Sequence, residues 1–192
     1  MIDSVDLNGV VYDGGVDSIA GTTATTDVLS LLGAGGDIAI DAIETVLGST
    51  GTDTVTLQSA NAATVWVSDV ESLVGSAGAD VVGMLAGGAL AVSDVETVIG
   101  STGTDELTLL SSGAITVSGV ETVTGTGQDT DVVTLRGNGA TVTVSSVATV
   151  LGTTGTDVLT MASTGLAVSA VETVLGSSDT ADTLSLLAAG SV

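Results

Sequence analysis

A unit of about 25 residues repeats along this chain, and the repeat constrains the fold more than any other feature of the sequence. Its clearest copy runs from Val95 to Leu109 and reads V-E-T-V-I-G-S-T-G-T-D-E-L-T-L. Alignment on the first residue of this motif gives seven units, which begin at Val16, Ile43, Val70, Val95, Val120, Val147 and Val171. Such a repeat indicates a stack of similar structural units in which each unit contacts its neighbours.

Each unit contains three segments in which apolar and polar residues alternate, the pattern of a half-buried β-strand. In the fourth unit these segments are about 89–93, 95–99 and 106–110. Thr, Val and Gly dominate, and no segment keeps a 3.6-residue period, so helices are not expected. The spacing of Val92, Val95 and Val98 breaks the alternation. We interpret this break as a bend between two faces that keeps all three side chains inward.

These patterns predict an all-β protein, a parallel β-solenoid of about seven coils of 24–27 residues with three short strands per coil, over 16–192. Like residues would stack on like, with Val on Val, Gly on Gly and Asp on Asp. The segment 1–15 reads as a partial N-terminal coil or cap, because 2–5 resembles the motif but Ile2 lies closer to Val16 than one full unit. A β-sandwich is the alternative, although sandwiches seldom repeat residue types in fixed columns.

The composition excludes several classes of partner. The chain has 23 acidic residues and one basic residue, Arg136, giving a net charge of −22. Nucleic acid and anionic membrane surfaces are therefore not expected as partners, whereas divalent cations or basic proteins are. No apolar run is long enough for membrane insertion. The start of the chain lacks the pattern of a cleaved signal peptide.

Catalysis has little support in the sequence. The chain has no Cys and no His, which removes the usual general base and the thiolate and imidazole metal ligands. No unit carries an insertion longer than three residues that could build a groove. We therefore expect that the protein is not an enzyme.

An aspartate column is the best candidate for a site. A Gly lies five residues after each unit's first residue, and an Asp follows it by five or six residues. The column consists of Asp27, Asp53, Asp80, Asp105, Asp131, Asp157 and Asp182. Taken alone, an Asp before a strand can cap its own turn. A stack of carboxylates can also recruit cations, because like charges about 4.8 Å apart repel.

The turns around Asp53, Asp80, Asp105 and Asp157 read G-x-x-G-x-D-x-U-x, which resembles the G-G-x-G-x-D-x-U-x repeat of RTX (hemolysin-type) calcium-binding proteins. The resemblance implies Ca²⁺ at the seven aspartates. It also implies a secreted or cell-surface location without a cleaved leader, as in bacterial surface-layer and adhesin-like members. Turn capping and calcium binding both stay open at this point.

Three further features have two interpretations each. A second acidic column is interpreted as a solvated face, with a cation stripe as the alternative; it contains Asp17, Glu44, Glu71, Glu96, Glu121 and Glu172, and Ala148 interrupts it. A Ser/Thr column invites an ice-binding interpretation, but β-propensity explains it; it contains Ser30, Thr56, Thr108, Thr134, Thr160 and Ser185. Trp66 is expected to point outward, either as a contact residue or as a tolerated surface ring.

The sequence stops at 188–192 within a strand pattern, so we expect either a longer array or an end that another molecule covers. If Val192 preceded the start of a second copy, the step from Val171 to the Ile2 of that copy would nearly equal the internal spacing. We therefore expect end-to-end self-association into a filament or surface layer. The alternative is a repeat segment of a large secreted adhesin, whose side face binds a surface polysaccharide or another cell-surface partner.

Overall fold

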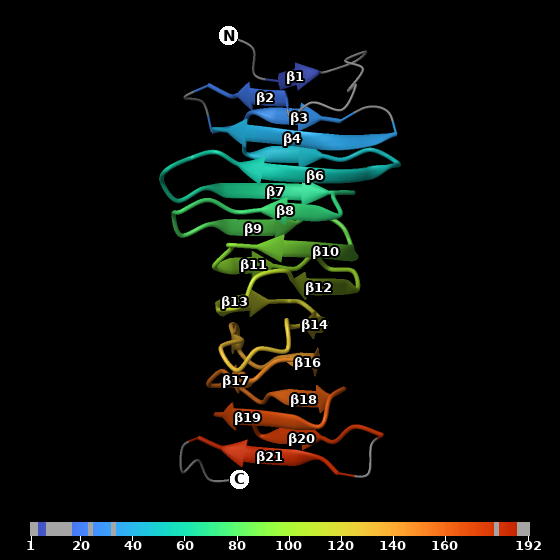
Figure 1. Cartoon of the computed structure of the whole chain (residues 1–192), viewed down its shortest axis with the longest axis vertical. Helices are drawn as coiled ribbons and strands as arrows, with labels where there is room; N and C mark the ends of the chain where they lie inside the picture. Colours follow the sequence, from blue (N-terminus) through green and yellow to red (C-terminus); the bar gives the residue numbers. More distant parts are fainter. Residues whose placement is uncertain (1–3, 7–16, 23–24, 32–33, 179–180, 188–192) are drawn as a thin grey trace.

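The chain forms a rod in which two parallel β-sheets face each other along the whole length (Figure 1). The computed structural model describes residues 4–6, 17–22, 25–31, 34–178 and 181–187. Within these residues there are 21 strands and no helix. Successive strands alternate between the two sheets, so each turn contributes one strand to each sheet. The predicted all-β parallel solenoid is confirmed.

We call the two sheets the odd sheet and the even sheet, after the numbers of their strands. The odd sheet contains β1 (Ser4–Asp6), β3 (Val28–Ser30), β5 (Thr45–Leu47), β7 (Thr64–Ser68), β9 (Val81–Met84), β11 (Thr97–Ile99), β13 (Ala114–Ser118), β15 (Val132–Leu135), β17 (Thr149–Leu151), β19 (Gly165–Ser169) and β21 (Thr183–Leu186). The even sheet contains β2 (Asp17–Ala20), β4 (Gly35–Asp41), β6 (Thr52–Leu57), β8 (Ser72–Val74), β10 (Gly88–Ser93), β12 (Asp105–Leu109), β14 (Thr122–Thr124), β16 (Thr141–Ser145), β18 (Val158–Met161) and β20 (Thr173–Leu175).

One turn of the solenoid is shorter than one sequence repeat. In the odd sheet Val28 pairs with Thr45, and Gly165 pairs with Thr183, so partners on adjacent turns lie about two thirds of a repeat apart in the sequence. A turn holds two strands, whereas a repeat holds three, so each repeat covers one and a half turns. The predicted strands are present. The detail that differs is the number of turns, which is about ten because the sheets have 11 and 10 strands.

The expectation that like residues stack on like is confirmed for inward valines, such as Val82 on Val98, but it is wrong for Gly and Asp, since Asp105 pairs with Gly88. The strands are of three kinds. The motif strands are β5, β8, β11, β14, β17 and β20. The aspartate strands directly follow a column aspartate or begin beside it, and they are β3, β6, β9, β12, β15, β18 and β21; the connecting strands are β4, β7, β10, β13, β16 and β19. Along each sheet these three kinds alternate; connecting strand β13, for example, pairs with motif strand β11 and aspartate strand β15. The pairing tolerates this because all three kinds share an inward apolar pattern.

The core between the sheets is thin and aliphatic. Left-handed bends turn the chain from one sheet to the other at the edge of this core. Val92, Val95 and Val98 are all buried, as the broken alternation predicts. Between the first two lies Asp94, whose φ of 54° is left-handed. Five non-glycine residues and one glycine take this conformation at equivalent bends: Ala42, Asp69, Asp94, Gly119, Ser146 and Ala170. The bend redirects the chain within one residue, which short strands require.

The glycine that recurs in each repeat is explained by the bend of the next turn. A Cβ on Gly75 would lie 1.8 Å from the carbonyl oxygen of Asp94, and one on Gly100 would lie 1.8 Å from that of Gly119. The Gly75 N–H donates to the carbonyl of Ser93 over 2.8 Å. Only glycine permits this approach of two backbones. The same contact recurs at Gly21, Gly48, Gly125 and Gly152.

Of the predicted N-terminal coil or cap at 1–15, the structure describes β1, which pairs with β3. The rest of that segment lies outside the described residues, as does the strand pattern at 188–192. The prediction of a partial cap therefore stays a prediction.

Replacing Gly75 with Ala tests the glycine contact. We expect Gly75→Ala to lower the free energy of unfolding by about 2–4 kcal/mol, because the new Cβ collides with a main chain that cannot move alone. Gly88→Ala is the matched control, since a Cβ there meets nothing within 4 Å. Urea unfolding followed by circular dichroism measures both variants. Equal stability of the two variants would contradict the explanation.

Candidate functional site

Six of the seven predicted aspartates are buried where the chain enters an aspartate strand. Asp27, Asp53, Asp80, Asp105, Asp131 and Asp157 each expose at most 1% of their surface. Asp182, at the last described turn, is exposed. Burying a carboxylate is unfavourable unless hydrogen bonds replace its water, so the contacts of these groups define the site.

The carboxylate of Asp80 shows how the charge is satisfied. Its Oδ2 accepts hydrogen bonds from the Ser76 backbone N–H at 2.6 Å and from the Ser76 hydroxyl at 2.9 Å. Its Oδ1 accepts a hydrogen bond from the backbone N–H of Ala63, on the preceding turn, at 2.8 Å. One side chain therefore closes its own turn and ties that turn to the one before.

The same arrangement recurs with small variations. Asp157 accepts from the backbone of Thr153 at 2.6 Å and from the backbone of Ala140 at 2.7 Å. Asp53 and Asp131 likewise reach a backbone N–H of the preceding turn, and the Ser or Thr hydroxyl contact recurs at Asp27, Asp105, Asp131, Asp157 and Asp182. In the first, fifth and seventh repeats the Ser or Thr lies five residues before the Asp instead of four. The extra residue is accommodated without loss of the contact.

The glutamate column is part of the same site. The backbone N–H of Asp105 donates to Oε2 of Glu121, on the following turn, at 2.9 Å, and the Glu121 N–H donates back to the Asp105 carbonyl at 3.2 Å. Equivalent N–H to carboxylate bonds of 2.7–2.8 Å join Asp27 to Glu44, Asp53 to Glu71, Asp80 to Glu96 and Asp157 to Glu172.

The sequence interpretation as a solvated face did not identify this role. The signal that could have found it is the separation of 15 to 18 residues from each Asp to its Glu, which is one turn. Where Ala148 replaces the Glu, the Asp131 N–H donates instead to the Gln128 carbonyl at 3.2 Å.

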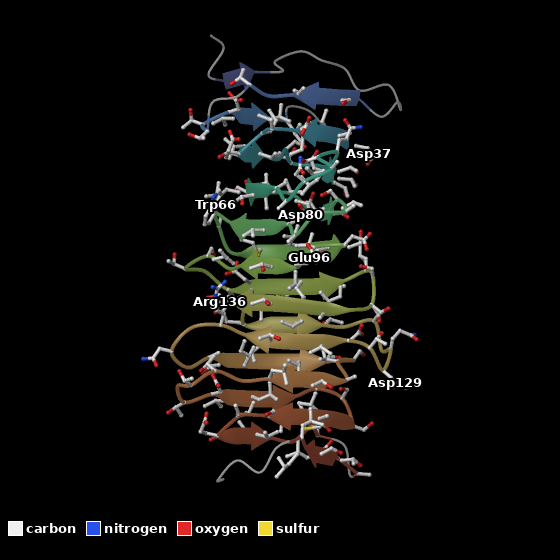
Figure 2. All side chains as sticks on the ribbon, turned by 90° about the vertical axis from the view of Figure 1, so that its left-hand side faces the viewer. Asp37, Trp66, Asp80, Glu96, Asp129 and Arg136 are labelled. Carbon is white, nitrogen blue, oxygen red and sulfur yellow. The ribbon has the colours of Figure 1, made fainter. Side chains whose placement is uncertain are left out.

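We call the five-part unit of Gly, Ser or Thr, Asp, left-handed bend and Glu the aspartate corner. In the fourth repeat it consists of Gly100, Ser101, Asp105, Gly119 and Glu121. The glycine serves both contacts, because a Cβ on Gly100 would also lie 2.8 Å from Oδ2 of Asp105. Figure 2 labels Asp80 and Glu96, which belong to the corner of the third repeat.

The corners are separated from one another. Because a repeat covers one and a half turns, successive corners begin strands of different sheets, as Asp80 precedes β9 and Asp105 begins β12. Corners of the same sheet are three turns apart, which is about 14 Å. The predicted stack of repelling carboxylates is therefore wrong.

Within the described residues, no group of three or more His, Cys, Asp or Glu side chains gathers to hold a metal ion. Calcium needs six to eight oxygen ligands, whereas the corner carboxylates accept N–H and O–H donors. This geometry gives the aspartates a turn-capping role. That the aspartates bind calcium stays a prediction, which rests on the resemblance to RTX repeats.

The structure also shows where Trp66 and the Ser/Thr column lie. Trp66 points outward with 37% of its surface exposed, and its ring covers Gly83 of β9, where a Cβ would lie 2.2 Å from Cε3. An aromatic ring over a glycine on the next strand restores the packing that the glycine lacks.

The Ser/Thr column is divided between the sheets: Ser30, Thr134 and Ser185 lie in the odd sheet, and Thr56, Thr108 and Thr160 lie in the even sheet. It therefore does not form one continuous surface.

The comparisons with known proteins add no relative. No protein-family model matches the chain, and no curated protein or solved structure is significantly similar to it. In the described part of the chain no helix is long and apolar enough to cross a membrane.

Variants of one corner separate its contributions. We expect Asp105→Ala to lower the free energy of unfolding by about 2–4 kcal/mol, because the half-buried Ser101 N–H loses its acceptor. Glu121→Ala should cost about 1 kcal/mol, since it removes one acceptor at the surface. Glu121→Gln is its control and should retain most of the stability, because the amide oxygen can still accept. Thermal and urea unfolding measure all three variants; full stability of Asp105→Ala would refute the corner's role.

Proposed function

We propose that this chain is a structural β-solenoid rod that works outside the cell as a subunit of a head-to-tail filament or surface layer. The aspartate corner carries the proposal. The polar residues that the sequence repeats most regularly hold the turns together: the Asp and the Glu join one turn to the next, and the Ser or Thr closes the turn of its own Asp. A repeat whose regular polar residues stabilise the stack of turns suits a protein with a structural role.

The contact pattern supports a mechanical role. Substantial strand-to-strand contacts occur between neighbours in the same sheet, such as β4 with β6 and β10 with β12. The backbone hydrogen bonds of the sheets therefore run along the rod, as in other stacked-repeat proteins. A structure of this kind lengthens by adding turns without any change in the turns already present.

The last described turn is suited to receive another turn. On β12 the inward residues Leu107 and Leu109 are 1% and 6% exposed, because β14 covers the next position. On β21 the equivalent Leu184 and Leu186 are 44% and 60% exposed. A further β-strand would cover these side chains and pair with the strand edge. In the proposed filament the first turn of a second copy supplies that strand.

End-to-end stacking predicts species that lengthen with concentration. We expect the chain to form elongated assemblies, and Leu186→Glu to prevent them, because a carboxylate would be buried at the junction without a partner. Thr173→Glu, on the outer side of β20, is the control of equal charge and should still assemble. Light scattering after size-exclusion chromatography, with negative-stain microscopy, measures length. Monomers alone at all concentrations would overturn the filament.

Calcium enters the proposal as a counter-ion. A net charge of −22 opposes the approach of two subunits, and divalent cations reduce such repulsion. We expect millimolar calcium to increase assembly size without changing the circular dichroism of the fold, because the corners are already closed by hydrogen bonds. Sodium chloride at matched ionic strength is the control. If calcium and sodium chloride act equally, a specific role for calcium is excluded.

A further inference from the structure

The outer face of the odd sheet carries no charge in a chain that is otherwise strongly acidic. The ten strands from β3 to β21 of this sheet contain no Asp, Glu, Lys or Arg. The outward positions of the even sheet, by contrast, include Asp37, Asp41 and Glu106. The one basic residue, Arg136, directly follows β15 and lies at the rim of the uncharged face. Figure 2 shows Trp66 and Arg136 on one side of the rod and Asp37 on the other.

Apolar side chains are spread along this face between threonines and serines. They are Val28, Leu47, Trp66, Val81, Ile99, Val132 and Leu151. Leu47 and Trp66 are 38% and 37% exposed. The Trp66 ring covers Gly83 on the neighbouring strand, so it adds apolar area to the sheet while it remains packed. The other five are partly exposed. Apolar side chains gathered on one face, without charged neighbours on the strands, can form an interaction site.

We propose that two copies of this chain pair side by side through the outer faces of their odd sheets. Electrostatics selects this face. Two chains of charge −22 repel each other, and the odd sheet is the side on which neither copy brings a carboxylate on a strand from β3 to β21. A two-fold pair uses the same patch on both copies, so one uncharged face is sufficient.

The size of the face sets the strength of the pairing. Ten strands about 4.8 Å apart extend over about 43 Å, and two or three outward positions per strand give a width of about 12–14 Å. Each copy would bury roughly 500–600 Å², a total at the lower end for specific complexes. The pair is therefore reversible, and it forms at higher concentration than an obligate dimer would.

A second copy fits this face better than a small ligand does. Small-molecule sites are concave, and hollows are found at the bends, such as the one around Asp94, Glu96 and Ser111. Face-to-face packing of β-sheets requires the opposite shape, a flat surface of side chains about 10 Å from its partner.

The pairing has a salt dependence opposite to that of an ion-paired interface. Its attraction is apolar, whereas the carboxylates on the rest of each rod repel. The screening length falls from about 30 Å at 0.01 M salt to about 8 Å at 0.15 M. Added salt therefore strengthens the pair.

This inference does not require the proposed filament, because the two contacts use different surfaces. Side-by-side pairing stops at two copies, whereas end stacking continues.

Analytical ultracentrifugation of the 192-residue chain tests the proposal. The same measurement on Leu186→Glu, in which end stacking is blocked, isolates the side-by-side contact. We expect Leu186→Glu to show a monomer–dimer equilibrium whose dimer fraction rises with sodium chloride between roughly 0.01 M and 0.5 M, and the unchanged chain to show the same sideways pairing in addition to end stacking. If Leu186→Glu stays monomeric at every concentration and salt level, the proposal is overturned, as it is by a dimer that salt dissociates.

Matched variants locate the contact. Ile99→Glu and Val132→Glu place a carboxylate on the odd face, and Val74→Glu and Val158→Glu place it at the same repeat positions on the even face. We expect the odd-face variants to weaken pairing by about tenfold or more, because an uncompensated charge would be buried. The even-face variants should pair as the unchanged chain does. Circular dichroism checks that all four fold, and equal weakening by odd-face and even-face variants would overturn the proposal.

Discussion

The contact between two backbones at each corner is the constraint on which the rest of this structure depends. Many strands here are only three or four residues long, too short for the hydrogen-bond ladder alone to decide where the chain turns. The turn is decided where a glycine meets the carbonyl of the next left-handed bend, as Gly100 meets Gly119. This contact holds the aspartate carboxylate inside the turn, where it accepts hydrogen bonds from the surrounding N–H groups.

The corners also explain how so acidic a chain can pack. Six carboxylates are buried, yet the chain has one basic residue. Backbone N–H groups and hydroxyls supply the compensation that lysine or arginine supplies elsewhere, as at Asp80. Hydrogen bonds to a charged acceptor are stronger than neutral ones. Each buried carboxylate can therefore stabilise the turn without a salt bridge.

The sequence predicted the strands because alternation of apolar residues is a local property, as at Ile115 and Val117, which both point inward. It did not predict which strands meet, because pairing depends on how far the chain travels in one turn. It predicted a bend between Val92 and Val95 but not the left-handed conformation of the bends, since Ala42 and Asp94 adopt φ values that usually indicate glycine. The Gly-Asp pattern itself was ambiguous for a physical reason: a calcium turn and a hydrogen-bonded corner both need a glycine beside a carboxylate.

The mismatch between a three-strand repeat and a two-strand turn has a consequence for how such a rod evolves. Duplication of one repeat adds one and a half turns, so every residue beyond the insertion moves to the opposite side of the rod. Duplication of two repeats adds three whole turns and leaves the far segment facing as before. A lineage that uses one side of the rod for contact can therefore gain or lose repeats freely only in pairs. Length and orientation are inherited together.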